Sequence, residues 1–275
     1  ILRCGSRTLD LSTPVVMGVL NVTPDSFSDG GRWLDADKAV QHSLQMIADG
    51  AGIIDVGGES TRPGAESVAV EEELRRVIPV IEALRKQTQV PISVDTSRPE
   101  VIHAAVEAGA CLINDIRALR ERGVLEAAAK TSAGICLMHM QGEPRTMQSS
   151  PRYDDVMSDV RGFLAERIAA CERVGISRDR IMVDPGIGFG KTQAHNLALL
   201  AHLSKLTSLG VPLLVGVSRK SLIGALTGRP VNERLAGSLA FATAAVLAGA
   251  SIIRAHDVAQ TVDVVRIASA LKQSH

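Results

Sequence analysis

Short apolar runs recur along the whole chain, and each is apolar at successive positions rather than at alternate ones. Such runs are typical of strands that are buried on both faces of a parallel sheet. Between them lie stretches with a 3.6-residue apolar repeat or a helix-forming composition. The predicted strands cover residues 15–21, 52–57, 91–96, 111–116, 134–139, 180–185, 212–218 and 251–256. The predicted helices cover residues 35–49, 70–86, 99–108, 124–130, 153–174, 195–208, 233–248 and 258–272.

The eight predicted strands and eight predicted helices alternate, and 275 residues match the usual size of a TIM barrel. No Pro/Gly/Ser-rich linker divides the chain, so we expect residues 1–275 to form one α/β domain, a single (β/α)8 TIM barrel. A doubly wound open sheet is the alternative, but its glycine-rich fingerprint normally follows the first strand directly, where residues 23–31 stand here. Residues 2–11, with Gly5 and Ser6 at their middle, predict a short N-terminal β-hairpin over the barrel floor.

The composition excludes several classes of protein. Hydrophobic residues are 45% and charged residues 22%, which is far from the composition of disordered chains. Thirty Lys and Arg balance thirty Asp and Glu, so no net field attracts nucleic acid or an anionic membrane. One Trp, one Tyr and four Phe are too few for single-strand stacking platforms. We therefore expect no nucleic-acid partner.

Residues 235–253 run without a charge over a length that could span a membrane. They are mostly Ala, Gly, Ser and Thr, and Gly249 divides them into a helix and a strand, so we expect no membrane association. Residues 1–10 lack the basic and then apolar make-up of a signal peptide. The four cysteines are widely spaced without a C-x-x-C pair, which indicates buried small hydrophobes in a reducing cytoplasm.

Polar residues follow the predicted strands at their carboxyl ends, where TIM barrels carry their active sites. A strand-end cap or rim ion pair explains any one of them about as well as a functional role, but the whole set favours a pocket. The set is Asn21, Thr61, Arg62, Asp95, Asn114, Asp115, His139, Asp184, Ser218, Arg219, Lys220, Arg254 and His256.

The set divides by chemistry. Asp95, Asn114 and Asp184 suit a flat heteroaromatic ring whose edge mixes N–H donors and carbonyl acceptors. The cationic or potentially cationic members suit a phosphate or diphosphate. They are Arg62, Lys220, Arg254 and His256. A phosphorylated heterocycle is the ligand that this combination predicts.

The sequence does not match several known nucleotide-binding and catalytic motifs. DPGIGFGKT (184–192) has Pro185 where a P-loop needs glycine, and Lys191 where a dinucleotide fingerprint needs its third glycine. No nucleophilic triad or zinc motif is recognisable. Methionines such as Met138 and Met140 more often fill a hydrophobic core than contact a ligand. We assign no function to His42, His103, His195, His202 and His275.

Two segments, MGVLNVTPDSFSDGG (17–31) and DVGGESTRPGA (55–65), resemble the signature segments of the dihydropteroate synthase family. The similarity continues in order to the last strand and covers essentially the full chain. The further matching segments are VDT (94–96), INDI (113–116), MHMQGEP (138–144), DPGIGFGKT (184–192), GVSRKS (216–221) and RAHD (254–257).

The resemblance implies joining of p-aminobenzoate to 6-hydroxymethyl-7,8-dihydropterin diphosphate, with release of diphosphate, in folate biosynthesis. It assigns a pterin pocket of Asp95, Asn114, Ile116, Met138, Asp184, Phe189, Gly216 and Lys220, so for Met138 it outweighs the core-filler prior. The implied diphosphate pocket is Asn21, Thr61, Arg62, Arg254 and His256. The implied p-aminobenzoate pocket is Phe27, Pro63, Phe189, Ser218 and Lys220.

The resemblance also implies Mg²⁺ held by the substrate diphosphate and Asn21, inhibition by sulfonamides, and a homodimer. The largely uncharged helix 233–248 and its neighbours are candidates for the dimer interface, although burial against the barrel alone would explain their composition. The chemistry favours loss of diphosphate to give a stabilised pterin cation, with Asp95, Asp184 and Lys220 as catalytic residues. Asp29 is a further candidate, although a loop turn residue explains it equally well.

Two other functions remain to be weighed. A methyltetrahydrofolate-dependent methyltransferase domain is also a pterin-binding barrel, but its reaction releases no diphosphate. It would leave the basic segments STRPG (60–64), SRK (218–220) and RAH (254–256) unexplained. A catalytically silent homologue that only binds pterin or a partner is the alternative from another class. The intact residues Asn21, Arg62, Lys220 and His256 argue against it.

Overall fold

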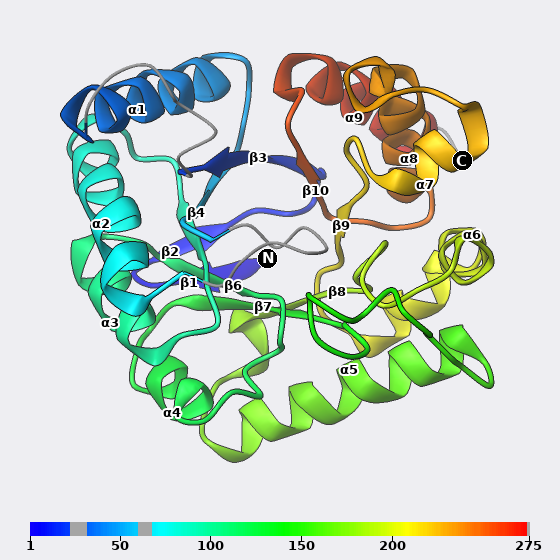
Figure 1. Ribbon diagram of the computed structural model, residues 1–275, viewed down its shortest axis with the longest axis horizontal. Coiled ribbons are helices and arrows are strands. Elements are labelled where there is room, and N and C mark those ends of the chain that lie inside the picture. The colour runs from blue at the N-terminus through cyan, green and yellow to red at the C-terminus, as the bar shows by residue number, and fades with distance from the viewer. Residues whose placement is uncertain (23–31, 60–67, 274–275) are drawn as a thin grey trace.

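A ring of parallel strands lies at the centre of the protein, and helices surround it (Figure 1). This computed structural model describes residues 1–22, 32–59 and 68–273. The eight-stranded sheet runs in the spatial order β8-β7-β6-β5-β4-β3-β10-β9, and a parallel bridge from Val183 to Leu213 brings β8 and β9 together. The (β/α)8 TIM barrel predicted from the sequence is confirmed. Its strands are β3 (Val15–Asn21), β4 (Ile53–Gly57), β5 (Ile92–Asp95), β6 (Leu112–Asp115), β7 (Gly134–Met138), β8 (Ile181–Asp184), β9 (Leu214–Gly216) and β10 (Ile252–Ala255).

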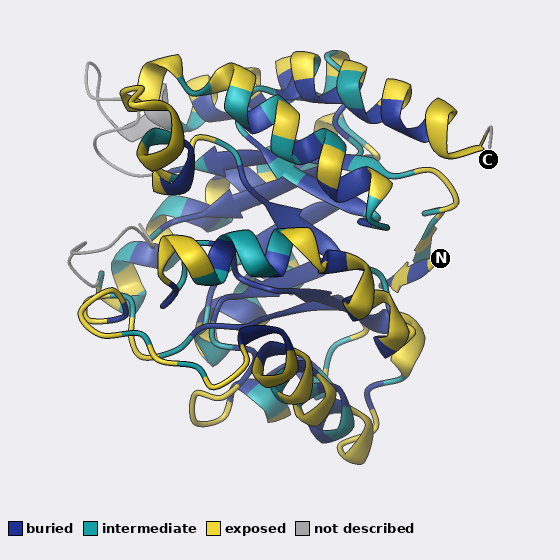
Figure 2. Ribbon diagram, turned by 90° about the vertical axis from the view of Figure 1, so that its right-hand side faces the viewer, coloured by how far each residue is buried: buried dark blue, intermediate teal, exposed yellow. Residues whose placement is uncertain are grey.

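The helices bury one side against the ring and expose the other, as Figure 2 shows by colour. Apolar repeats predicted most of them within a few residues. They are α1 (Arg32–Ala48), α2 (Val70–Gln87), α3 (Pro99–Ala108), α4 (Val124–Ala129), α5 (Val156–Arg173), α6 (Gln193–Ala201), α7 (Ser221–Thr227), α8 (Leu235–Leu247) and α9 (Val258–Gln273). Shorter 3-10 turns are η2 (Arg178–Arg180), η3 (Leu203–Leu209) and η4 (Val231–Glu233).

Two helical predictions differ from the structure. The segment predicted as one helix over 195–208 is α6 followed by η3, with the break at His202. The seven-residue α7 has no counterpart in the prediction, because two turns interrupted by Gly224 are too short to show a helical repeat. The uncharged stretch 235–253 is α8, a turn and the start of β10. In the described ranges, no helix has both the length and the apolar character needed to cross a membrane.

The N-terminal hairpin closes one end of the barrel, as expected from the sequence. Strands β1 (Leu2–Cys4) and β2 (Arg7–Leu9) pair in antiparallel register. Leu2 and Cys4 are fully buried in an apolar cluster with interior residues from the starts of the barrel strands. We call this cluster the floor. It consists of Leu2, Cys4, Met17, Ile53, Leu112, Cys136, Met182, Leu214 and Ile252.

The loop after β8 passes very close to the loop after β7, and this contact requires a glycine. A Cβ atom on Gly186 would lie 1.9 Å from the carbonyl oxygen of His139, and the φ of Gly186 is +66°. Gly175 has a φ of +88° but would meet nothing within 4 Å. A side chain at Gly175 would therefore meet only backbone strain, whereas a side chain at Gly186 would meet both backbone strain and a steric clash.

We expect Gly186→Ala to lower the free energy of unfolding by ~1–3 kcal/mol more than Gly175→Ala, because only the first adds a clash to the strain of a left-handed backbone. Urea denaturation of the two variants and the wild type provides the measurement. Equal losses of unfolding free energy in the two variants would show that the loops after β7 and β8 can move apart without a measurable cost.

Candidate active site

An ion network lies inside the barrel near the carboxyl ends of its strands. Arg254, on β10, donates from Nε to Asp55 Oδ2 at 2.7 Å and from Nη2 to Asp95 Oδ2 at 3.0 Å. Asn114, at the end of β6, donates from Nδ2 to the same Asp55 oxygen at 3.0 Å. Asp55 is fully buried. Charges at this depth are stable only when paired, so these four side chains depend on one another.

Asp55 was missed by the sequence analysis, which placed functional residues only at strand ends. It lies in the middle of β4, one strand away from Asp95 on β5. Its Oδ1 atom is buried and has no hydrogen-bond partner among the described residues. The available signal was a single carboxylate inside an otherwise apolar run, since a buried strand does not carry a charge without a partner.

Asp184 and Lys220 approach each other across the junction between β8 and β9. Asp184 ends β8 and accepts a hydrogen bond at Oδ1 from the Gly186 amide at 2.7 Å. The Lys220 ammonium donates to the Ile187 carbonyl and lies 4.8 Å from the centroid of the Phe189 ring. Burial raises the pKa of Asp184 and lowers the pKa of Lys220 to about 8, and each charge opposes the shift of the other.

Lys191 holds the loop after β8 in place. Its buried ammonium donates to the carbonyls of Gly186 and Phe189, each at 2.9 Å, and lies 2.9 Å from Nδ1 of His139. Burial lowers the pKa of Lys191 to about 7. Burial, and next the charge of Lys191, lower the pKa of His139 to about 3, so this histidine is neutral. Lys191 therefore has a structural role, which agrees with the rejection of a P-loop.

An apolar wall lies beside these polar groups. It brings together three residues of the predicted pterin pocket, namely Ile116, Met138 and Phe189. Met140 and Met147 complete the same cluster, and both are buried. Met147 was not singled out in the sequence because it follows a loop with no periodic pattern. Flexible thioether side chains of this kind adapt to a flat ring.

The loop after β9 contacts the end of β10. His256 donates its backbone N–H to Ser218 Oγ at 3.2 Å, and its ring Nδ1 lies 3.1 Å from the same oxygen. Arg219 has a φ of 58°, which is unusual for a residue other than glycine. Its amide donates to Ser238 Oγ at 2.9 Å, and its guanidinium pairs with Asp257. The guanidinium of Arg219 is therefore occupied by Asp257, and Ser218 and Lys220 flank Arg219 in the sequence.

Neighbouring strands place the remaining predicted residues. Asn21 ends β3 and pairs with Gly57, which in turn pairs with Asp95 on β5. A Cβ atom on Gly216, at the end of β9, would lie 3.7 Å from Arg254 Cβ and 3.9 Å from Lys220 Nζ. Five predicted site residues lie outside the described residues: Phe27, Asp29, Thr61, Arg62 and Pro63.

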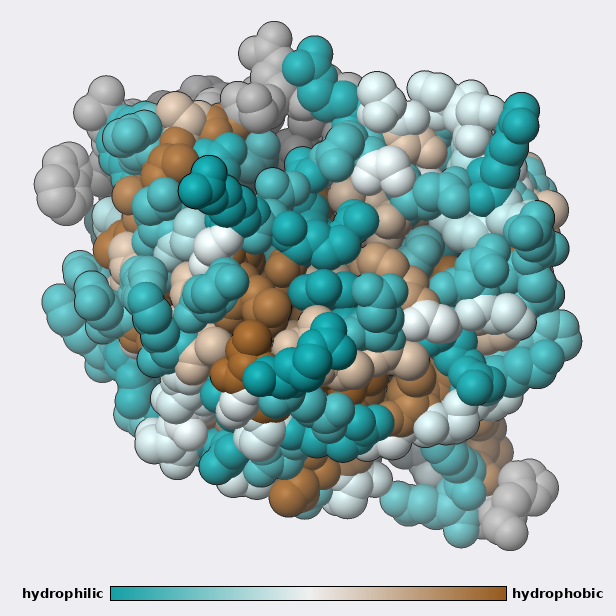
Figure 3. Space-filling model, turned by 90° about the horizontal axis from the view of Figure 1, so that it is seen from below, coloured by the Kyte–Doolittle hydropathy of each residue, from teal (hydrophilic) through white to brown (hydrophobic). Residues whose placement is uncertain are grey.

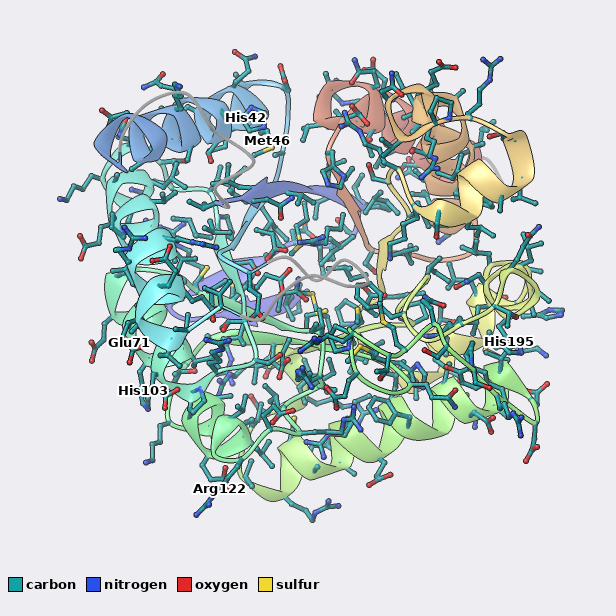
Figure 4. The ribbon with its side chains drawn as sticks, in the orientation of Figure 1. His42, Met46, Glu71, His103, Arg122 and His195 are labelled. Carbon is teal, nitrogen blue, oxygen red and sulfur yellow. The ribbon has the colours of Figure 1, made fainter. Side chains whose placement is uncertain are left out.

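The structure thus brings together residues that the sequence analysis divided between two pockets. Arg254, predicted for the diphosphate, lies between Asp55 and Asp95, beside the residues predicted for the pterin. Three histidines without an assigned function lie on outer helices, away from this site: His42 on α1, His103 on α3 and His195 on α6 (Figure 4). His195 takes part in the capping box at the start of α6.

Comparison with known proteins identifies this arrangement. Residues 17–256 match the family model described as pterin binding enzyme. The dihydropteroate synthase of Escherichia coli (strain K12) is 57% identical over 263 residues, which cover 96% of this chain and 93% of the relative. The chain belongs to the dihydropteroate synthase family.

Solved structures of dihydropteroate synthases share the whole fold. The Yersinia pestis enzyme, solved with a sulfonamide drug, is 54% identical with a TM-score of 0.94, and the match covers 99% of both chains. The Xanthomonas albilineans enzyme, solved in complex with 7,8-dihydropteroate, is 48% identical with a TM-score of 0.86, covering 98% of this chain and 97% of that one. Similarity at this level places the chain with the dihydropteroate synthases rather than with pterin-dependent methyltransferases.

The burial of Asp95 makes its contribution to the stability of the protein depend on pH. Burial raises the pKa of Asp95 from 3.8 to about 8, against the attraction of Arg254. The folded state therefore binds more protons than the unfolded chain between these values, and the contribution of Asp95 to stability falls as pH rises through them. We expect the melting temperature of Asp95→Asn, relative to wild type, to increase from about pH 5 to about pH 8.

Asp37→Asn, a change at an exposed position on α1, should show no such trend relative to wild type. If the attraction of Arg254 outweighed burial, the Asp95→Asn difference would change in the opposite direction.

Proposed function

We propose that this chain joins p-aminobenzoate to 6-hydroxymethyl-7,8-dihydropterin diphosphate, giving 7,8-dihydropteroate and diphosphate, with residues 1–275 acting as one pterin-binding barrel domain in folate biosynthesis. The observation that carries the proposal is the pairing of buried polar groups with an apolar wall at one end of the barrel. The Asp55–Arg254–Asp95 network and the Asp184–Lys220 pair supply charges and hydrogen bonds. Ile116, Met138 and Phe189 supply the apolar surface.

The pterin ring fits this site by its chemistry. Carboxylates accept from the ring N–H and amino groups, while the Asn114 amide and the Lys220 ammonium donate to its carbonyl and ring nitrogens. We assign pterin recognition to Asp95, Asn114, Asp184 and Lys220. Ile116, Met138, Phe189 and Gly216 would form the flat walls, where the absent side chain of Gly216 leaves space beside Lys220. Asp55 would hold Arg254 and Asn114 in position.

The reaction needs charge separation more than it needs a nucleophile. Breaking the CH₂–O bond of the pterin substrate leaves a cation on the pterin and an additional negative charge on diphosphate. The amine nitrogen of p-aminobenzoate then bonds to the CH₂ carbon and loses a proton. Asp184, and Asp95 in its ionised form, stabilise the cation, while Arg254 and His256 stabilise the departing diphosphate. Asn21, Thr61 and Arg62 would complete the diphosphate pocket, and Asp29 remains a further candidate near the cation.

Magnesium fits the end of β3. A Cβ atom on Gly57 would lie 3.9 Å from Asn21 Oδ1 and 3.8 Å from Asp95 Oδ2, so the missing side chain leaves a space flanked by two hard oxygen donors. Mg²⁺ prefers oxygen ligands and commonly reaches proteins through a substrate phosphate. Asn21 would hold it against the diphosphate, where the ion would neutralise charge on the leaving group.

The p-aminobenzoate site would lie next to the pterin and use Ser218, Lys220 and Phe189. Phe27 and Pro63, which lie outside the described residues, are further candidates for it. Lys220 offers a cation for the carboxylate of p-aminobenzoate, and Phe189 offers a ring face. Sulfonamides share the arylamine and would compete at the same place. Since the Yersinia pestis relative was solved with a sulfonamide drug, we propose this chain as a sulfonamide target too.

We test the reaction by following diphosphate release from the pterin diphosphate with p-aminobenzoate, with and without Mg²⁺. The wild type should release diphosphate only with Mg²⁺. Asp184→Asn should lower kcat/KM by about 100-fold or more, because a buried partner of the ligand loses its charge. Asp37→Asn should match the wild type. Absence of release by the wild type would identify a silent pterin-binding homologue, and near-normal Asp184→Asn activity would remove Asp184 from the pocket.

We also propose that the chain forms a homodimer in the cytoplasm. Large exposed hydrophobic side chains gather on adjacent elements at the C-terminal side of the barrel: Leu226 on α7, Val231 on η4, Leu235 and Leu247 on α8, and Ile267 and Leu271 on α9. The opposite face, formed by α4 and α5, is largely covered by hydrophilic groups with hydrophobic ones between them (Figure 3). Four free cysteines suit a reducing compartment.

Light scattering tests the dimer. The wild type should have twice the 29.1 kDa mass of one chain. Leu247→Glu, which adds a charge to a side chain that is 48% exposed, should shift the mass toward the monomer. Val174→Glu, 40% exposed at the end of α5, should leave the mass unchanged. A monomeric wild type would contradict the proposal.

A further inference from the structure

Two of the four cysteines meet at the floor of the barrel, far along the chain from each other. Cys4 ends β1 and is fully buried, whereas Cys111 directly precedes β6 and is partly exposed. Cys111 packs against the floor cluster that contains Cys4. Gly134 lies against both cysteines: a Cβ atom on Gly134 would lie 3.3 Å from the Cβ of Cys4, and its amide donates to the Cys111 carbonyl at 2.9 Å. Each thiol is the largest influence on the pKa of the other.

The backbone holds both residues firmly in this arrangement. The Cys111 amide donates to the Ile92 carbonyl, and the Cys111 carbonyl accepts from the Gly134 amide, both at 2.9 Å. The hairpin is fixed on its side by a bond of 2.8 Å from the Gly5 amide to Ser132. A Cβ atom on Gly5 would lie only 3.6 Å from the Cβ of Cys111, so the hairpin turn lies directly against this residue.

Two arginines near Cys111 share one hydrogen-bond partner. Arg7 on β2 and Arg85 on α2 both donate to the Gln89 side chain, at 2.7 and 3.2 Å. Arg85 also packs against Gly109, two residues before Cys111. The neighbouring Cys4 thiol first, then the hydrogen bond with Ile92 and these two cations, lower the pKa of Cys111 to about 7 against the effect of its burial. Thiolates formed in such surroundings are the reactive form of cysteine.

The other cysteines provide an internal contrast. Burial raises the pKa of Cys136 and raises that of Cys171 to about 11, and among the described residues no other thiol contributes to either shift. Both behave as small buried hydrophobes, which was the expectation for all four. Cys4 and Cys111 depart from it.

We propose that Cys4 and Cys111 form a reactive thiol pair on the barrel floor, in which Cys111 is the site of oxidation by hydroperoxides and Cys4 resolves the product into a disulfide. The Cys111 thiolate attacks the terminal peroxide oxygen, the O–O bond breaks, and the released alkoxide or hydroxide takes a proton. Cys4 sulfur then attacks the sulfenic sulfur, the S–O bond breaks, and water leaves with the Cys4 proton. Two thiols are oxidised, and one hydroperoxide is reduced.

The disulfide would join the N-terminal hairpin to the start of β6 without touching the carboxyl-end pocket. It would close a loop of about a hundred residues, so the oxidised protein should melt at a higher temperature, reversibly with dithiothreitol. The state of the thiols and the melting temperature can both be measured without the reaction proposed above, so the two proposals can fail separately.

The experiment exposes the full chain to hydrogen peroxide, blocks free thiols under denaturing conditions and maps the peptides by mass spectrometry. The wild type should lose two of its four thiols and yield a Cys4–Cys111 cross-linked peptide. Cys4→Ala should stop at sulfenic acid on Cys111, which dimedone traps, and Cys111→Ser should keep Cys4 reduced. Cys171→Ala, a matched change at another buried cysteine, should behave as the wild type does.

A second measurement follows alkylation of Cys111 by iodoacetamide against pH. The midpoint should lie near 7 in the wild type and higher in Cys4→Ala, which loses the neighbouring thiol but keeps Arg7 and Arg85. A wild-type chain that retains four alkylatable thiols after peroxide would overturn the proposal. Sulfenic acid that persists on Cys111 of the wild type would overturn the role of Cys4.

Discussion

Arg254 reaches past β3 from β10 to the carboxylates on β4 and β5, and the polar side of the pocket depends on this interaction. A buried charge costs several kcal/mol unless it is paired, so Asp55 and Arg254 stabilise one another, and Arg254 also lowers the cost of ionising Asp95. Asn114 joins the network from β6. Four strands of the barrel therefore contribute to one set of bonds, and the rigid sheet fixes the positions of the charges before any ligand arrives.

The barrel was predictable because its strands are continuous apolar runs, and their carboxyl ends carry the polar residues. The pocket was predictable only in part. Asp55 and Arg254 are 199 positions apart in sequence, and no local pattern relates them. The same reason explains why Arg254 was assigned to the diphosphate alone, although it pairs with Asp95. Met147 and the structural role of Lys191 likewise depend on contacts between loops, which periodicity does not report.

The two ends of the barrel use their interior differently. At the floor, apolar side chains from the strand starts pack against the hairpin, and polar backbone groups of the hairpin find partners in neighbouring loops. At the carboxyl end, four strands finish in a carboxylate or amide side chain: β3 in Asn21, β5 in Asp95, β6 in Asp115 and β8 in Asp184. The loops supply apolar contacts through Met140, Met147 and Phe189. Stability and chemistry are thereby separated along the barrel axis, as in other proteins of this fold.

The junction between β8 and β9 has a consequence for the whole molecule. In the described part of the chain, an isolated bridge from Val183 to Leu213 joins these strands, whereas neighbouring strands elsewhere in the ring share several paired residues. Asp184 directly follows that bridge on one side, and Lys220 follows β9 on the other. A pterin that bonds to both side chains would link β8 to β9, where the strands are joined by a single bridge. Binding would therefore stabilise the closed barrel at its weakest strand junction.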